Sequence, residues 1–259
     1  FAESLRDAGD FTAMETELQK QPTGFFIDFW TKVLKKKGEL HHTEGIRDDI
    51  KRIEDHINAP RSLERKHIGY AELAEATYQA TGKYPAKFLR IAEAELQAFI
   101  KKQIKIETAR GSDFPMSSAA YRQALLVRNA GPLASAYITC GNYDKAWSIV
   151  RMFDPDIHDS YDRTQMDVIS TRGHIIEEII DSHFAHGDSR KGVQAGLQWL
   201  SDRSRFKNYG IRSETIEMRM VLAQKMQELG DPRYSEMMRL ALQGITEYSQ
   251  VTEAKNGIV

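Results

Sequence analysis

The densest group of potential metal ligands lies between residues 174 and 186. It consists of His174, Glu177, Glu178, Asp181, His183 and His186. Imidazole and carboxylate groups bind zinc and iron, but the segment lacks the His-Glu-x-x-His and Glu-x-x-His patterns that converge from a helix onto a metal. Isoleucines and Phe184 predict the buried stripe of this helix, which leaves His174, Glu177, Glu178 and Asp181 on its solvent face. We therefore expect no metal site here.

The acidic loop from Asp154 to Asp159 could indicate calcium binding. An EF-hand loop requires glycine at its sixth position and glutamate at its twelfth. Those positions hold Asp159 and Gln165. A turn with solvated acids is therefore the better interpretation.

Cys140 is the only cysteine, which excludes an intramolecular disulfide and leaves too few thiolates for a structural zinc or iron–sulfur site. It precedes Gly141 at an expected helix C-terminus, where the helix dipole disfavours the thiolate. The sequence contains no P-loop, no strand followed by a dinucleotide-binding loop and no nucleophile elbow. We expect no catalytic residue and no cofactor, while an α-helical enzyme with a dispersed active site stays an alternative.

Charge is balanced over the whole chain but not along it. The 36 basic and 37 acidic residues give a net charge of −1, so there is no overall attraction to nucleic acid or anionic lipid. Residues 141–188 carry four basic and ten acidic side chains, whereas residues 189–225 carry eight basic and three acidic ones. Neighbouring segments of opposite sign can orient a partner.

In the positive segment, cations alternate with aromatic residues at an expected loop between helices. These residues are Arg203, Arg205, Phe206, Lys207 and Tyr209. The cations could hold phosphates while the rings stack on unpaired bases. Alternatively, the rings fill the junction between helices and the cations stay in solvent. We take these five residues as the candidate partner-binding site.

The elements that carry these residues are predicted to be helices throughout. Apolar residues recur at spacings of three and four, as in the isoleucine stripe of residues 46–57, and alternating strand patterns are nearly absent. Gly38 predicts a helix end, and Pro85 predicts the first turn of a long helix. A break at 110–115 separates an N-terminal helical region, 1–110, from a helical-repeat region, 111–259, which we expect to be continuous with it.

Short glycine turns connect consecutive helix patterns. They contain Gly9, Gly82, Gly141, Gly187 and Gly230, and Asp or Asn follows four of these glycines. Glycine suits the left-handed residue that ends one helix, and the following Asp or Asn can cap the next. Such short connections force consecutive helices to lie antiparallel, so the sequence predicts a series of αα-hairpins.

The segment from Leu133 to Val150, with Gly141 at its turn, resembles the helix pair of tetratricopeptide and pentatricopeptide repeats. Residues 175–197 and 220–242 are further candidates, so the resemblance covers mainly residues 115–248. It implies an irregular right-handed α-solenoid of antiparallel helix pairs whose concave surface binds a peptide or RNA. The later glycines are 46 and 43 residues apart, whereas tetratricopeptide units span about 34 residues, so the spacing itself indicates only successive hairpins.

Because no reaction is indicated, we expect a non-enzymatic helical-repeat adaptor or scaffold in a protein or ribonucleoprotein assembly. The alternative is an organellar, pentatricopeptide-like protein that binds single-stranded RNA. No apolar run approaches the roughly 20 residues that span a bilayer, so we expect no membrane insertion. The single cysteine fits a reducing compartment inside the cell, either the cytosol or an organelle matrix such as that of mitochondria.

Overall fold

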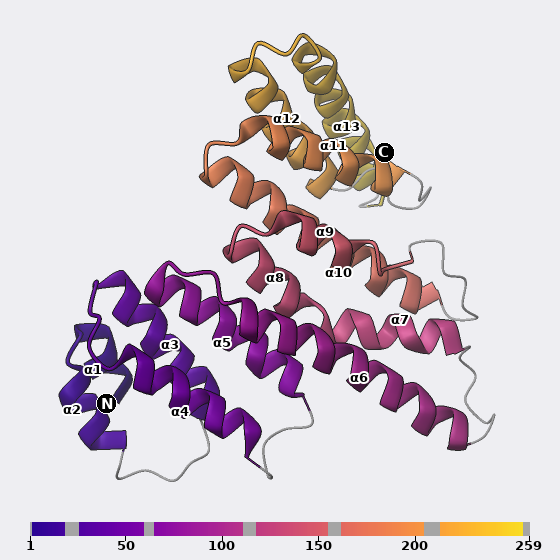
Figure 1. The fold of residues 1–259 in the computed structure, drawn as a ribbon. Coiled ribbons are helices and arrows are strands. Elements are labelled where there is room, and N and C mark those ends of the chain that lie inside the picture. Colours follow the sequence, from indigo (N-terminus) through magenta and orange to yellow (C-terminus); the bar gives the residue numbers. More distant parts are fainter. Residues whose placement is uncertain are drawn as a thin grey trace. The chain divides into compact units, whose positions relative to one another are not determined.

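The computed structural model describes residues 2–18, 26–59, 65–110, 118–154, 162–204 and 213–255. Within these ranges the regular elements are all α-helices and none is a strand, which confirms the all-α prediction. In chain order they are α1 (Ala2–Ala8), α2 (Phe11–Leu18), α3 (Phe26–Glu39), α4 (Ile46–Asn58), α5 (Lys66–Thr81), α6 (Ala86–Arg110), α7 (Ser118–Asn129), α8 (Gly131–Thr139), α9 (Tyr143–Val150), α10 (Asp162–Ala185), α11 (Ser189–Ser204), α12 (Ser213–Glu228) and α13 (Tyr234–Lys255) (Figure 1). They form two compact units, residues 1–168 and 169–259, and the division lies within α10.

Helix contacts recur along the first unit, residues 1–168. α3 packs against α4 and α5, and α4 also packs against α5. In the same way, α5 packs against α6 and α8, and α6 also packs against α8, which in turn packs against α9. These contacts define three helix pairs, α3 with α4, α5 with α6, and α8 with α9. The first helix of each of the first two pairs also contacts the first helix of the next pair. The right-handed solenoid stays a prediction.

The second unit, residues 169–259, is built around α12, which packs against α11 and α13. Its core cluster consists of the buried side chains Val193, Leu222 and Met226. Partly buried residues that pack against this cluster are Phe184, Leu197, Leu200, Met218 and Met237. The end of α10 and the start of α13 thus share one core with α11 and α12.

The five predicted glycine turns all contain left-handed glycines, with φ between 66° and 78°. At Gly9, Gly141, Gly187 and Gly230, the glycine N–H donates to the carbonyl three residues back. The N–H of the next residue donates to the carbonyl five residues back, which completes a Schellman motif. At Gly82 the N–H donates to the carbonyl of Tyr78. The predicted helix ends are confirmed at these positions.

Gly38 does not end α3, contrary to the sequence prediction. The helix continues to Glu39, and the left-handed residue that follows is His41, with φ of 53°. A Cβ at Gly38 would stand 2.7 Å from the Cα of Ala80 and closer still to the carbonyl oxygen of Gln79. Glycine is needed here because the backbones of α3 and α5 approach each other closely.

A charged pair is buried between α3 and α4. Lys37 Nζ lies 2.6 Å from Asp49 Oδ2, and the two side chains are 3% and 1% exposed. Lys37 also donates to the carbonyl oxygen of Glu44 at 3.2 Å, and its Nζ lies 5.2 Å from the centre of the Phe11 ring. Asp49 can therefore share the buried face of α4 with isoleucines, because its charge is compensated.

Two further expectations concern the whole chain. None of the described helices combines the length and the apolar character needed to cross a membrane. α6 ends at Arg110, and residues 111–117 lie outside the described ranges. The expected division between regions 1–110 and 111–259 therefore stays a prediction.

Candidate functional site

The predicted partner-binding patch falls at the end of α11. Arg203 belongs to the last turn of this helix, but its side chain lies outside what the structure describes. Arg205, Phe206, Lys207 and Tyr209 also lie outside the described residues. This patch stays a prediction, and described residues of the same unit form a candidate site.

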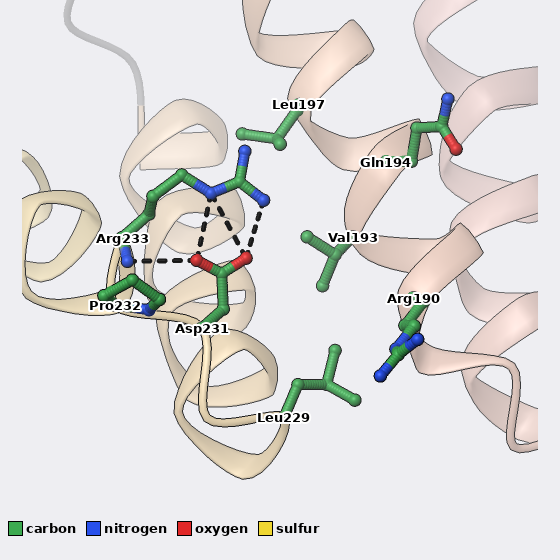
Figure 2. Close-up of a pocket in the computed structure, with 8 residues that line it drawn as sticks. All are labelled: Arg190, Val193, Gln194, Leu197, Leu229, Asp231, Pro232 and Arg233. Atoms are coloured by element: carbon green, nitrogen blue, oxygen red, sulfur yellow. Dashed lines mark hydrogen bonds and ion pairs between the residues drawn. The ribbon is translucent and has the colours of Figure 1, made fainter.

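A groove of about 600 Å³ lies between α11 and the turn that joins α12 to α13 (Figure 2). It is lined by Arg190, Val193, Gln194 and Leu197 from α11 and by Leu229, Asp231, Pro232 and Arg233 from the turn. Five of these eight residues are exposed, so the groove is open to solvent. Its volume falls within the range of about 300–1,000 Å³ that is common for ligand sites.

The floor of the groove is apolar. Val193 is only 4% exposed and belongs to the core cluster, and Leu197 packs against that cluster. These residues are four positions apart, which places them on the same side of α11, and Figure 2 shows both side chains pointing into the groove. Leu229, which is 38% exposed, adds apolar surface from the opposite wall.

The Gly230 turn forms that opposite wall. The Asp231 N–H donates to the carbonyl of Met226 at 2.8 Å, and the Asp231 carboxylate accepts the backbone N–H of Arg233 at 3.0 Å. The Tyr234 N–H then donates to the carbonyl of Asp231 at 3.1 Å. These hydrogen bonds form a tight turn at Asp231, and α13 begins after it at Tyr234.

Asp231 and Arg233 compensate each other at the edge of the groove. Arg233 Nη2 lies 2.6 Å from Asp231 Oδ2, and Arg233 Nε lies 3.0 Å from Oδ1 (Figure 2). The side-chain hydrogen bonds from Arg233 lower the pKa of Asp231 to about 2. The carboxylate is therefore ionised at neutral pH, and the pair contributes little net charge.

Arg190, on the other side of the groove, has no such partner. Within the described part of the chain it makes no hydrogen bond and no ion pair. The neighbouring Lys191 is compensated, because its Nζ lies 2.7 Å from Asp188 Oδ2. The groove therefore combines an apolar floor with one uncompensated positive charge.

The second unit also exposes large apolar side chains on its last two helices. They are Met220 and Val221 on α12 and Tyr234, Leu242, Ile245 and Tyr248 on α13, with exposed fractions between 39% and 57%. Apolar side chains mark an interaction site when they form a contiguous exposed patch. The groove thus lies in a unit that keeps several apolar residues in contact with solvent.

The potential metal ligands of α10 do not gather at one point. His174 Nδ1 lies 3.2 Å from Glu177 Oε2 at an exposed position, whereas His183 is 3% exposed, and burial lowers the pKa of His183. Over the described ranges of the chain, no three or more His, Cys, Asp or Glu side chains are placed to hold a metal ion. Asp154 is described, but residues 155–161 of the acidic loop lie outside the described ranges.

Cys140 is buried at the end of α8, with 8% of its surface exposed. Burial raises the pKa of its thiol to about 12. A thiol with this pKa is protonated at neutral pH and is a poor nucleophile.

The sequence does not identify the groove, although the spacing of two of its residues gives a partial indication. Val193 and Leu197 have the spacing of a buried helix face, but their opposite wall comes from a turn more than 30 positions later. Arg190 lies in the positive segment 189–225 without any local pattern that separates it from the other cations. Only tertiary packing identifies it as a groove residue.

No family model, no curated protein and no solved structure matches this chain.

Proposed function

We propose that this chain is a non-enzymatic helical-repeat adaptor that binds a segment of a partner protein in the groove between α11 and the α12–α13 turn. The observation that carries the proposal is the groove, which has the apolar floor Val193 and Leu197 and is open to solvent. The partly exposed side chains of Leu197 and Leu229 lose contact with water when a partner binds, which favours association.

The packing of the first unit supports the repeat-like part of the proposal. In stacked helix pairs each pair contacts its neighbours along the chain. The recurring contacts of α3, α5 and α8 follow this rule, and the turns at Gly82 and Gly141 join α5 to α6 and α8 to α9 closely enough for antiparallel pairing.

The distribution of titratable groups supports binding over catalysis. Burial is the main cause of the altered pKa values of His67, Glu72, Tyr137, Cys140 and His183. None of these residues lines the groove. A catalytic site would be expected to combine such groups in a cleft.

The groove favours a protein partner over RNA. Single-stranded RNA is usually held by several cations together with aromatic rings that stack on bases. The groove lining contains no aromatic residue and one uncompensated cation, Arg190. RNA binding elsewhere on this chain, as in the predicted Arg203–Tyr209 patch, is the alternative outcome of the test.

The proposal is tested with two matched leucine variants of the full chain. Leu229→Ser changes the groove wall, and Leu242→Ser changes a more exposed leucine of α13 outside the groove. Proteins captured by the wild-type chain are quantified by mass spectrometry beside those captured by each variant. We expect Leu229→Ser to reduce the recovery of a specific partner by about tenfold, because burying a leucine side chain contributes roughly 1.5–3 kcal/mol and about 1.4 kcal/mol corresponds to a tenfold change in affinity.

Circular dichroism of both variants controls for the helical fold. The groove assignment is contradicted when Leu229→Ser and Leu242→Ser retain the same partners to the same extent. Capture that disappears after ribonuclease treatment, with no change for Leu229→Ser, supports the RNA alternative instead.

A further inference from the structure

We propose that the groove selects a partner segment that carries an acidic side chain beside apolar ones, with Arg190 binding the acid and with Val193 and Leu197 contacting the apolar side chains. This inference rests on the proposed function of the groove as a protein-binding site. It adds the chemistry by which the partner is recognised.

The charges around the groove lead to this assignment. The Asp231 carboxylate is occupied by Arg233, with contacts of 2.6 Å and 3.0 Å, and Lys191 is occupied by Asp188. Arg190 is exposed and makes no hydrogen bond or ion pair with the described residues. The electrostatic complement of the groove is therefore a negative charge next to apolar surface.

The position of Arg190 in α11 supports a role in binding rather than in folding. Arg190 lies in the first turn of this helix, which contains no acidic residue. The helix dipole makes a cation unfavourable there. Lys191 offsets this effect through its ion pair with Asp188, whereas Arg190 has no comparable contact. Local helix stability therefore does not explain an arginine at this position.

The spacing along α11 defines the length of the recognised segment. Arg190, Val193 and Leu197 follow one another at intervals of three and four residues, so they form one ridge of the helix. Arg190 and Leu197 are about 10 Å apart along the helix axis, given a rise of about 1.5 Å per residue. An acid and an apolar residue span a similar distance when they are seven positions apart in a helix or three apart in an extended segment.

The groove does not have the features of a phosphate or nucleic-acid site. A phosphate group usually binds several cations or a set of free backbone N–H groups. Here Arg233 is already engaged by Asp231, and no aromatic ring lines the groove. A carboxylate needs only one arginine, which can hold it through two parallel hydrogen bonds.

The experiment is a selection from a random peptide library displayed on phage. The full chain, its Arg190→Gln variant and its Leu229→Ser variant are used as separate targets. Arg90→Gln is the matched control, because Arg90 is an exposed arginine of α6 in the other unit. We expect the wild type and Arg90→Gln to enrich peptides with Asp or Glu at one of the two stated spacings from Leu, Ile or Phe.

The best enriched peptide is then synthesised with its acid and with glutamine in place of the acid. We expect the change to glutamine to weaken binding to the wild type by about threefold to fivefold, as for a solvent-exposed ion pair. Binding to Arg190→Gln should change by less than about twofold, because the pair is already lost. We also expect Arg190→Gln to keep or slightly raise the melting temperature, because it removes a cation from the first turn of α11.

Two results separate this inference from the proposed function. The first result is that the enriched peptides lack an acid, bind Arg190→Gln as well as the wild type and still lose binding to Leu229→Ser. This result overturns the inference but leaves the groove as a protein-binding site. The absence of any peptide that distinguishes the wild type from Leu229→Ser overturns both. A melting temperature that falls clearly in Arg190→Gln gives Arg190 a structural role and also overturns the inference.

Discussion

The two units of this chain differ in which side chains they bury and which they expose. Residues 1–168 bury charged and polar side chains between helices, whereas residues 169–259 expose large apolar ones. Among the described residues, two of the nine exposed large apolar side chains belong to the first unit and seven to the second, although the second unit is shorter. Exposed apolar surface therefore concentrates in the unit that contains the groove.

Several polar side-chain contacts join different helices in the first unit, and in the second unit Arg219 Nη1 donates to the carbonyl of Leu240 at 3.3 Å. The Gln123 side chain donates to the carbonyl of Met152 and accepts the backbone N–H of Asp154, at 3.2 Å in both cases. Tyr137 Oη donates to Glu93 at 3.0 Å, and Lys145 Nζ lies 3.0 Å from the same carboxylate. Each contact is satisfied only when the helices lie in one arrangement, so such contacts specify the packing as well as stabilise it.

The comparison agrees with the proposal that the second unit binds a partner. A buried polar contact is costly when broken, which favours one rigid arrangement. An exposed apolar side chain contributes little to folding but is available to a partner. Four experiments test this difference, from the largest expected effect to the smallest.

The largest effect is expected for Lys37→Met in the first unit. The variant leaves Asp49 buried without its main charge partner, so we expect a loss of about 3–5 kcal/mol in the free energy of unfolding. Urea unfolding, with hydrogen exchange of residues 26–58, gives the measurement. The double variant Lys37→Met/Asp49→Leu should recover most of the loss, and a double variant as unstable as the single one contradicts the prediction.

The second test compares glycines at close helix contacts. Gly38→Ala places a Cβ against the backbone of α5 and should cost about 2 kcal/mol or more, because neither helix can shift easily. In the second unit, Gly196→Ala meets the side-chain end of Leu222, and alanine gains about 1 kcal/mol in helix propensity. We expect the smaller change there. Equal losses in urea unfolding would remove the contrast in rigidity between the units.

The third test compares two helix caps. Asn142 Oδ1 accepts the backbone N–H of Lys145 at 3.2 Å, and its Nδ2 donates to Tyr84 Oη at 2.7 Å, so it also joins two hairpins. We expect Asn142→Ala to cost about 1–2 kcal/mol. Asp188 pairs with Lys191 within its own turn, so Asp188→Ala should cost less. Thermal unfolding measures both, and the reverse order would contradict the proposed coupling of hairpins by Asn142.

The smallest effect on folding is expected for the exposed residues of α13. Leu242 and Tyr248 are 57% and 45% exposed, so Leu242→Ser and Tyr248→Ser should change the free energy of unfolding by less than about 0.5 kcal/mol. Binding of a hydrophobic fluorescent dye should nevertheless decrease, because accessible apolar surface is removed. A large loss of stability would mean that these side chains support the fold.

Much of the local structure was predictable from the sequence. The stripe of Ile46, Ile50, Ile53 and Ile57 predicts the buried face of α4. Three of these side chains are buried, and Ile50 is half-buried. The glycine turns were equally predictable, since the hydrogen bonds of a Schellman motif join residues no more than five positions apart. The interpretation of Gly38 as a helix end was wrong because its need for glycine comes from the approach of another helix, not from its own φ.

The candidate site was much less predictable. The sequence patch Arg203, Arg205, Phe206, Lys207 and Tyr209 relied on composition within one loop and stays untested. The groove forms where α11 packs against the turn between α12 and α13, and neither of these segments carries a recognisable motif. Arg190 becomes distinctive only when the pairing of Lys191 and Arg233 is known.

The sequence by itself determined where the helices run and where the left-handed glycines end them, because helix periodicity and backbone freedom act within a few residues. Only the tertiary structure decided that Lys37 faces Asp49, that Gly38 lies against α5 and that Val193 and Leu197 face the Gly230 turn. Those contacts join residues between 12 and about 40 positions apart. They depend on shape and charge across helix surfaces, which the periodicity of either helix alone does not specify.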